Sequence, residues 1–84
     1  MSNQITLYTG PTCPPCIVAK RRLDAQSIPY SAVDLSEDAA ALARLKDHFG
    51  VPQIQTPIIH YAGEYGTIAD LTDVINTYKK EHAA

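Results

Sequence analysis

Two cysteines set three positions apart are the residues of this 84-residue sequence with the clearest chemical use. Cys13 and Cys16 stand in the run GPTCPPC at residues 10–16, and the sequence contains no other cysteine. One such pair cannot form the framework of a disulfide-rich secreted domain. The spacing predicts either redox chemistry between the two thiols or one half of a metal site.

The surroundings of the pair favour redox chemistry. A zinc site needs further ligands, but His48, His60 and His82 show no paired spacing with one another or with the cysteines. Inert thiols are typically buried, whereas Cys13 lies in a proline-rich loop, where we expect it to be exposed. We therefore predict a reactive dithiol.

A strand and a helix are predicted on either side of Cys13. Residues 5–9 alternate apolar and polar side chains, are rich in β-branched and aromatic types, and stop at Gly10-Pro11. A helix should follow and end before the break at residues 27–29. Its apolar stripe is predicted to be Cys16, Ala19 and Leu23.

This placement predicts different roles for the two thiols. Pro14 suits the first position of the helix, where its missing N–H would be unpaired anyway, so Cys13 becomes the N-cap. A thiolate there faces the positive end of the helix dipole, and the pKa of Cys13 should fall below the free value of about 8.5. We expect Cys13 to attack a disulfide, and Cys16, one turn on and deeper, to resolve the mixed disulfide.

A second strand and a second helix are predicted next. The crossover from the first strand to residues 30–35 is long enough to make the two strands parallel in a right-handed unit. Ser36 should cap a helix that has Glu37 and Asp38 in its first turn and ends at Gly50. Its apolar positions are Leu42, Leu45 and Phe49.

A hairpin and a last helix complete the order. Strands over residues 58–61 and 64–67 flank Ala62-Gly63, which suits a tight two-residue turn. Asp70 should cap the last helix, which carries its apolar stripe at Leu71, Val74, Ile75 and Tyr78. The order β-α-β-α-β-β-α predicts one α/β domain over residues 1–84, with a four-stranded mixed sheet and three helices on its faces.

Composition argues against several kinds of partner. A formal net charge of -2 offers no broad basic surface for nucleic acid. The opening residues 1–4 are polar, and no run approaches the ~18 apolar residues of a membrane span. We therefore expect a cytoplasmic protein that binds neither nucleic acid nor membrane. The basic run Lys20-Arg21-Arg22 is interpreted as a solvated helix face favoured by the dipole.

Several short motifs resemble the glutaredoxin signature. The motifs YT, TCPYC, AK and a following leucine of that family fall in register with Tyr8-Thr9, Thr12 to Cys16, Ala19-Lys20 and Leu23. Thr56-Pro57 resembles the cis-proline segment of thioredoxin-fold proteins, and residues 66–71 resemble the family's glycine-glycine-x-x-Asp-Leu stretch. The resemblance spans nearly the whole chain and implies the thioredoxin-like glutaredoxin fold with thiol-disulfide oxidoreductase activity.

The resemblance also implies where substrates bind. Thr56-Pro57 would be cis and stand opposite Cys13, where the Thr56 backbone can hold the substrate chain. Asp70 would hold the γ-glutamyl end of glutathione. The implied substrate-binding residues are Thr12, Pro14, Pro15, Thr56, Pro57, Thr67, Ile68, Ala69 and Asp70. No bound cofactor or metal is implied.

Departures from the family leave the electron source open. Many glutaredoxins have a lysine where this chain has Gly10, and Thr67 and Ala69 replace a glycine and a frequently polar residue. Gln55 and Lys20-Arg21 instead resemble the NrdH redoxins, a branch that supplies electrons to ribonucleotide reductase and is reduced by thioredoxin reductase. The tryptophan-containing stretch of that branch is not matched before the last helix.

We therefore expect a monomeric dithiol reductase of protein disulfides, with glutathione or thioredoxin reductase as its electron source. An NrdH-type donor to ribonucleotide reductase is the first alternative. A metal or iron-sulfur carrier that uses Cys13 from two chains is the alternative from another class, against which the second cysteine and the two intervening prolines weigh.

Overall fold

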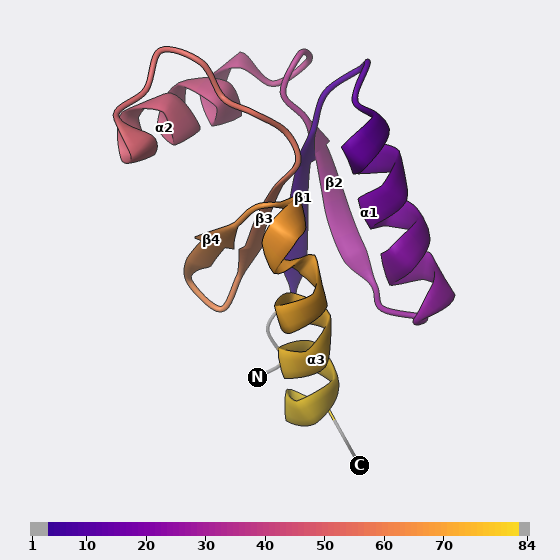
Figure 1. Cartoon of the computed structure of the whole chain (residues 1–84). Coiled ribbons are helices and arrows are strands. Elements are labelled where there is room, and N and C mark those ends of the chain that lie inside the picture. The colour runs from indigo at the N-terminus through magenta and orange to yellow at the C-terminus, as the bar shows by residue number, and fades with distance from the viewer. Residues whose placement is uncertain (1–3, 83–84) are drawn as a thin grey trace.

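The computed structural model describes residues 4–82, which form one mixed sheet with helices on both faces (Figure 1). Its elements are β1 (Ile5–Thr9), α1 (Pro14–Ala25), β2 (Tyr30–Asp34), α2 (Ala39–Phe49), β3 (Ile58–Tyr61), β4 (Glu64–Gly66), a 3-10 turn η1 (Ile68–Asp70) and α3 (Leu71–Glu81). The predicted order β-α-β-α-β-β-α is confirmed. None of these helices is long and apolar enough to cross a membrane.

The sheet has the strand order β2-β1-β3-β4, so β1 lies inside it. β1 runs parallel to β2, with Ile5 opposite Tyr30 and Thr9 opposite Asp34. β3 is antiparallel to both β1 and β4. The first strand therefore has hydrogen-bonded neighbours on both edges, and its carboxyl end is fixed where α1 must begin.

The core is divided between the two faces of the sheet, because side chains alternate between these faces along each strand. α1 and α3 cover one face and α2 covers the other (Figure 1). Under α1 and α3 lie Ile5, Leu7, Ala19, Leu23, Ile28, Ile59, Tyr61, Leu71 and Ile75. Under α2 lie Leu35, Ala41, Leu45 and Ile58. The predicted stripe of α1 is confirmed, because Cys16, Ala19 and Leu23 are its buried residues.

The start of α2 differs from the prediction. Asp38 is the N-cap, and its Oδ1 accepts a hydrogen bond from the backbone N–H of Ala41 at 3.0 Å. Ser36 instead donates from its backbone N–H and its hydroxyl to Asp34 Oδ1, at 2.9 and 2.6 Å. These two bonds, the hydroxyl's first, hold the pKa of Asp34 below its usual value, and the charge of Lys20 adds to them. Ser36 and Glu37 therefore lie before the helix, not in it.

The other end of α2 is confirmed in part. Gly50 ends the helix in the left-handed conformation, with φ of 66°, as the C-cap prediction required. Phe49, which was placed on the apolar stripe, is 41% exposed, whereas Leu45 and Ala41 are buried. The buried face of α2 has therefore turned away from Phe49 by the last residue of the helix.

The hairpin and the last helix were predicted with two errors. Ala62 and Gly63 both have positive φ, as a tight two-residue hairpin turn requires. β4, however, ends at Gly66, and Thr67 caps the short turn η1 that precedes α3. Asp70 makes no side-chain cap to α3; its carboxylate bonds back to the N–H of Thr67 instead. The residue expected to cap α3 thus closes a capping box one turn earlier.

Replacing Asp38 with alanine should lower the free energy of unfolding by about 1 kcal/mol, because the substitution removes the N-cap acceptor of α2. Ser36→Ala should cost less, since the bonds of Ser36 lie in an exposed turn outside the helix. Urea unfolding of both variants beside the native protein measures the difference. A larger loss for Ser36→Ala would contradict the observed cap.

Candidate active site

α1 begins at the end of β1, and its first turn is built around Cys13. Cys13 is the N-cap with extended backbone (φ -139°, ψ 91°), and Pro14 and Pro15 occupy the first two helical positions. The Cys13 carbonyl accepts from the N–H groups of Cys16 and Ile17, at 3.0 and 3.3 Å. The predicted N-cap and the predicted place of Pro14 are confirmed.

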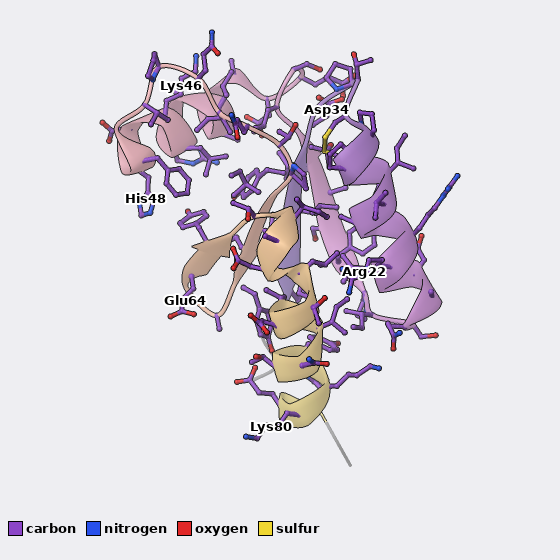
Figure 2. The ribbon with its side chains drawn as sticks, viewed as in Figure 1. Arg22, Asp34, Lys46, His48, Glu64 and Lys80 are labelled. Carbon is purple, nitrogen blue, oxygen red and sulfur yellow. A yellow bond between two sulfur atoms is a disulfide. The ribbon has the colours of Figure 1, made fainter. Side chains whose placement is uncertain are left out.

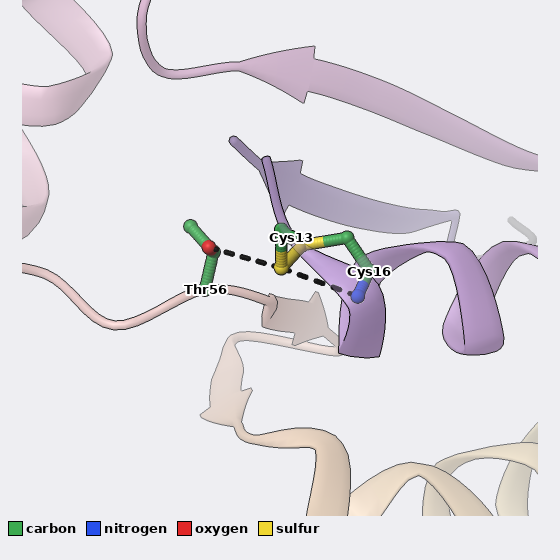
Figure 3. The surroundings of a disulfide bond; sticks show 3 residues. All are labelled: Cys13, Cys16 and Thr56. Carbon is green, nitrogen blue, oxygen red and sulfur yellow. Dashed lines mark hydrogen bonds between the residues drawn. A yellow bond between two sulfur atoms is a disulfide. The ribbon is translucent and has the colours of Figure 1, made fainter. Parts of the chain in front are cut away.

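The two cysteines form a disulfide across this first turn (Figure 3). Their Cα atoms are 5.2 Å apart, within the usual range for a disulfide. In the view of all side chains, the sulfur atoms lie at the start of α1 (Figure 2). The structure therefore represents the oxidised form of the dithiol pair.

Both sulfur-bearing residues are buried, although not equally. Cys13 is 8% exposed and Cys16 is 2% exposed. The prediction that Cys13 would be exposed in its loop is wrong for this form, because its sulfur is covered by the bonded Cys16 and by Thr56. The predicted order holds, with Cys16 the deeper of the two.

The Cys13 sulfur accepts hydrogen bonds from two directions (Figure 3). The backbone N–H of Cys16 donates to Sγ at 3.2 Å, and the hydroxyl of Thr56 donates to the same atom at 3.2 Å. The amide donor follows from the absence of N–H groups on Pro14 and Pro15. The hydroxyl donor was missed, because sequence reasoning had assigned Thr56 a role only through its backbone. The signal was a hydroxyl-bearing residue directly before Pro57.

The pairing of β3 with β1 brings Thr56 to Cys13. Tyr8 lies opposite Ile58 in the antiparallel register, so the residues before Ile58 run beside the residues after Tyr8. The Thr56-Pro57 peptide bond is cis, and Pro57 is buried. The implied cis bond and its place opposite Cys13 are therefore both observed.

Gly10 also lies beside Thr56. A Cβ atom built on Gly10 would be 3.4 Å from Thr56 Oγ1, which is van der Waals contact. A side chain at position 10 would therefore touch the hydroxyl that donates to Cys13. The lysine that many glutaredoxins carry there would change more than the local charge.

Residues 67–70, the segment expected to bind glutathione, hydrogen-bond to one another. Asp70 Oδ2 accepts from the backbone N–H of Thr67 at 2.9 Å and from its hydroxyl at 3.3 Å. The Thr67 hydroxyl oxygen in turn accepts from the N–H of Ala69 at 3.3 Å. η1 lies against α1, so this segment is beside the helix that carries the cysteines. Thr67, Ala69 and Asp70 are exposed and Ile68 is half-buried, while Thr12, Pro14 and Pro15 are exposed around the disulfide.

A cavity of about 270 Å³ lies between the β3–β4 hairpin and α3. Tyr65, Asp70 and Asp73 are among its lining residues, and neither cysteine is. The cavity therefore lies to one side of the disulfide, and the reacting sulfur atoms do not open into it.

His60, His82 and Arg22 make contacts within the fold. His60 stacks on Tyr65 with ring centroids 4.3 Å apart, and His82 stacks on Tyr78 at 4.0 Å. Over residues 4–82 there is no group of three or more His, Cys, Asp or Glu side chains suited to a metal ion. Arg22 lies between α1 and α3 and donates to the Thr72 hydroxyl at 2.7 Å (Figure 2). Arg22 is half-buried and its bond to Thr72 is exposed, so this part of the basic run also joins α1 to α3.

Comparison with known proteins agrees with this arrangement. The sequence profile described as Glutaredoxin matches residues 5–61, which run from β1 to β3 and include both cysteines and Pro57. A glutaredoxin of Neisseria meningitidis serogroup A is 40% identical over 63 residues, covering 70% of this chain and 74% of that one. The chain belongs to the glutaredoxin family.

Solved structures place this glutaredoxin among thioredoxin-like folds. The thioredoxin-like protein BC3987 is 32% identical with a TM-score of 0.72, over 84% of this chain and 99% of that one. The glutaredoxin-like protein NrdH-redoxin from Escherichia coli has a TM-score of 0.72 over 84% of this chain and 93% of that one. At 16% identity, the second likeness shows the fold alone. This glutaredoxin is a redox protein with its cysteine pair at residues 13 and 16.

Cys13→Ser should abolish disulfide reduction, whereas Cys16→Ser should stop dithiol turnover but let a mixed disulfide accumulate on Cys13. Only the sulfur at the N-cap is favoured as a thiolate, and it is the less buried of the two. Mass spectrometry after substrate addition locates the adduct. An adduct trapped on Cys16 in the Cys13→Ser variant at the native rate would reverse the roles.

Pro15→Ala should lower the pKa of Cys13 by about one unit, because it restores an N–H at the second helical position, from which N-cap side chains also accept. Pro14→Ala is the matched control, since the N–H of the first position does not normally reach the N-cap side chain. Thiolate absorbance titrated in both reduced variants measures the shift. Equal pKa values for native and Pro15→Ala protein would show that the missing amide has no effect.

Proposed function

We propose that this glutaredoxin reduces protein disulfides by dithiol exchange through its CPPC motif. The observation that carries the proposal is the disulfide between Cys13, at the N-terminus of α1, and Cys16, on the buried stripe of the same helix. One sulfur is placed where a negative charge is favoured, and the other is held one turn away for an intramolecular step.

The proposed cycle moves two electrons from the dithiol to the substrate. The Cys13 thiolate attacks one sulfur of the substrate disulfide, forms a mixed disulfide and releases the first substrate thiolate. The Cys16 thiolate then attacks Cys13 Sγ, forms the Cys13–Cys16 disulfide and releases the second substrate thiolate. The oxidised protein returns to the dithiol when an external reductant supplies two electrons. The cycle uses no bound cofactor.

Substrate binding is proposed at the edge where Thr56-Pro57 meets Cys13. The main chain of a substrate would hydrogen-bond to the Thr56 backbone beside Cys13, as an added strand would. The exposed Thr12, Pro14 and Pro15 would contact the same chain around the disulfide. We propose that residues 1–84 act as one domain and as a monomer in the reducing cytoplasm, where a dithiol can be regenerated.

Thioredoxin reductase is the electron source that we favour over glutathione, and ribonucleotide reductase is then a candidate substrate, as for NrdH redoxins. Three features support this choice. Gly10 supplies no cation for a carboxylate of glutathione, Thr67 adds a β-branched side chain where the family has glycine, and the Asp70 carboxylate already accepts two bonds from Thr67. Each feature weakens capture of a small anionic tripeptide. A docked protein chain needs none of these contacts.

Native protein should turn over poorly with glutathione and glutathione reductase and better with thioredoxin reductase, in steady-state reduction of the same model disulfide. Gly10→Lys combined with Thr67→Gly should improve the glutathione rate about tenfold or more, since a hydrogen bond to a charged group is worth roughly 1.5–3 kcal/mol.

The control for this experiment is Gly10→Ala combined with Thr67→Gly. It places the same Cβ against Thr56 and opens the same segment, but it adds no charge. A native glutathione rate equal to that of the lysine variant would mean that other residues supply the contacts, and the electron source would be glutathione. Equal rates for the alanine and lysine variants would show that the cation at position 10 does not matter.

A further inference from the structure

The Cys13 sulfur has one backbone donor and one side-chain donor around it. Within residues 4–82, Sγ accepts from the N–H of Cys16 and from the hydroxyl of Thr56, each at 3.2 Å. The second helical position would ordinarily offer another N–H to an N-cap side chain, but Pro15 has none. The sulfur thus has one backbone donor fewer than this helix start can offer, and a side-chain donor stands on its other side (Figure 3).

We propose that the Thr56 hydroxyl is a catalytic hydrogen-bond donor that stabilises the Cys13 thiolate and replaces the backbone donor removed by Pro15. The proposal rests on the role proposed above for Cys13 as the attacking thiol. A hydrogen bond to the charged form of a group favours that form and lowers the pKa of an acid. Bonds to an ionised acceptor are about twice as strong as neutral ones. The hydroxyl therefore does more for the thiolate than for the disulfide seen here.

Local packing keeps the hydroxyl in place. Thr56 is half-buried and is followed by the buried Pro57, whose segment is fixed by the pairing of Ile58 with Tyr8. Hydrogen bonds in partly dry surroundings are electrostatically stronger than in water. A Cβ atom at position 10 would already contact Thr56 Oγ1. Because Gly10 has no side chain, nothing at this position occupies the space beside the hydroxyl. The donor is already within hydrogen-bonding distance of Sγ in the oxidised form.

Thr56→Val tests the proposal, because valine keeps the β-branched shape and removes the hydroxyl. Thiolate absorbance is titrated in a Cys16→Ser background, so that only Cys13 contributes. We expect the pKa of Cys13 to rise by about one unit, which leaves about tenfold less thiolate at pH values below the pKa. Thr56→Ser, which retains a hydroxyl, should restore most of the native value. The pH profile of alkylation by iodoacetamide in the full dithiol protein should shift in the same direction.

A double variant tests whether the Thr56 hydroxyl replaces the amide donor that Pro15 lacks. Adding Pro15→Ala to Thr56→Val returns an amide donor and should bring the pKa of Cys13 back toward the native value. An unchanged pKa in Thr56→Val, or an equal rise in Thr56→Ser, would overturn the assignment of the hydroxyl. Failure of Pro15→Ala to lower the raised pKa would overturn the replacement. These titrations measure the pKa of Cys13 without a protein substrate. The proposed reductase function is tested separately, by turnover of a disulfide substrate.

Discussion

The antiparallel pairing of β3 with β1 is the constraint on which the site depends. Tyr8 lies opposite Ile58, so the chain before β3 must pass beside the chain after β1. Thr56 and Cys13 are 43 positions apart in the sequence, yet this register leaves them within one hydrogen bond of each other. A shift of β3 by one residue would also exchange its two faces, because side chains alternate along a strand. The same register thus fixes both the core and the contact at the sulfur.

The helix that follows β1 sets the unequal environments of the two thiols. Cys16 shares a buried stripe with Ala19 and Leu23, so packing of α1 on the sheet directs Cys16 toward the core. Cys13 precedes the first turn and stays at the edge of that packed face, where the helix dipole is positive. Cys16 is 2% exposed and Cys13 is 8% exposed, so the difference is small but has the expected direction. Hydrophobic packing therefore makes Cys16 the deeper of the two cysteines.

Local patterns predicted much of this fold, and non-local contacts account for most of the errors. The limits of β1, the stripe of α1 and the end of α2 at Gly50 follow from spacing and from single residues. Ser36 and Asp38 were both suitable N-caps for α2. Ser36 does not cap the helix because its backbone N–H and hydroxyl both donate to Asp34. The burial of Cys13 arises partly from the distant Thr56, a contact that no spacing rule reports.

The segment before α3 shows how a helix cap can limit ligand binding. Its residues resemble a glutathione site in sequence, but Thr67 and Asp70 already satisfy each other's polar groups in a capping box. A ligand that recruits Asp70 must either use the carboxylate oxygen left over or displace an existing bond of 2.9 Å. Where a bond is displaced, the gain is the difference between two similar hydrogen bonds, which is small. Pairing of a protein chain with the Thr56 backbone, as proposed above, would leave the bonds between Thr67 and Asp70 in place.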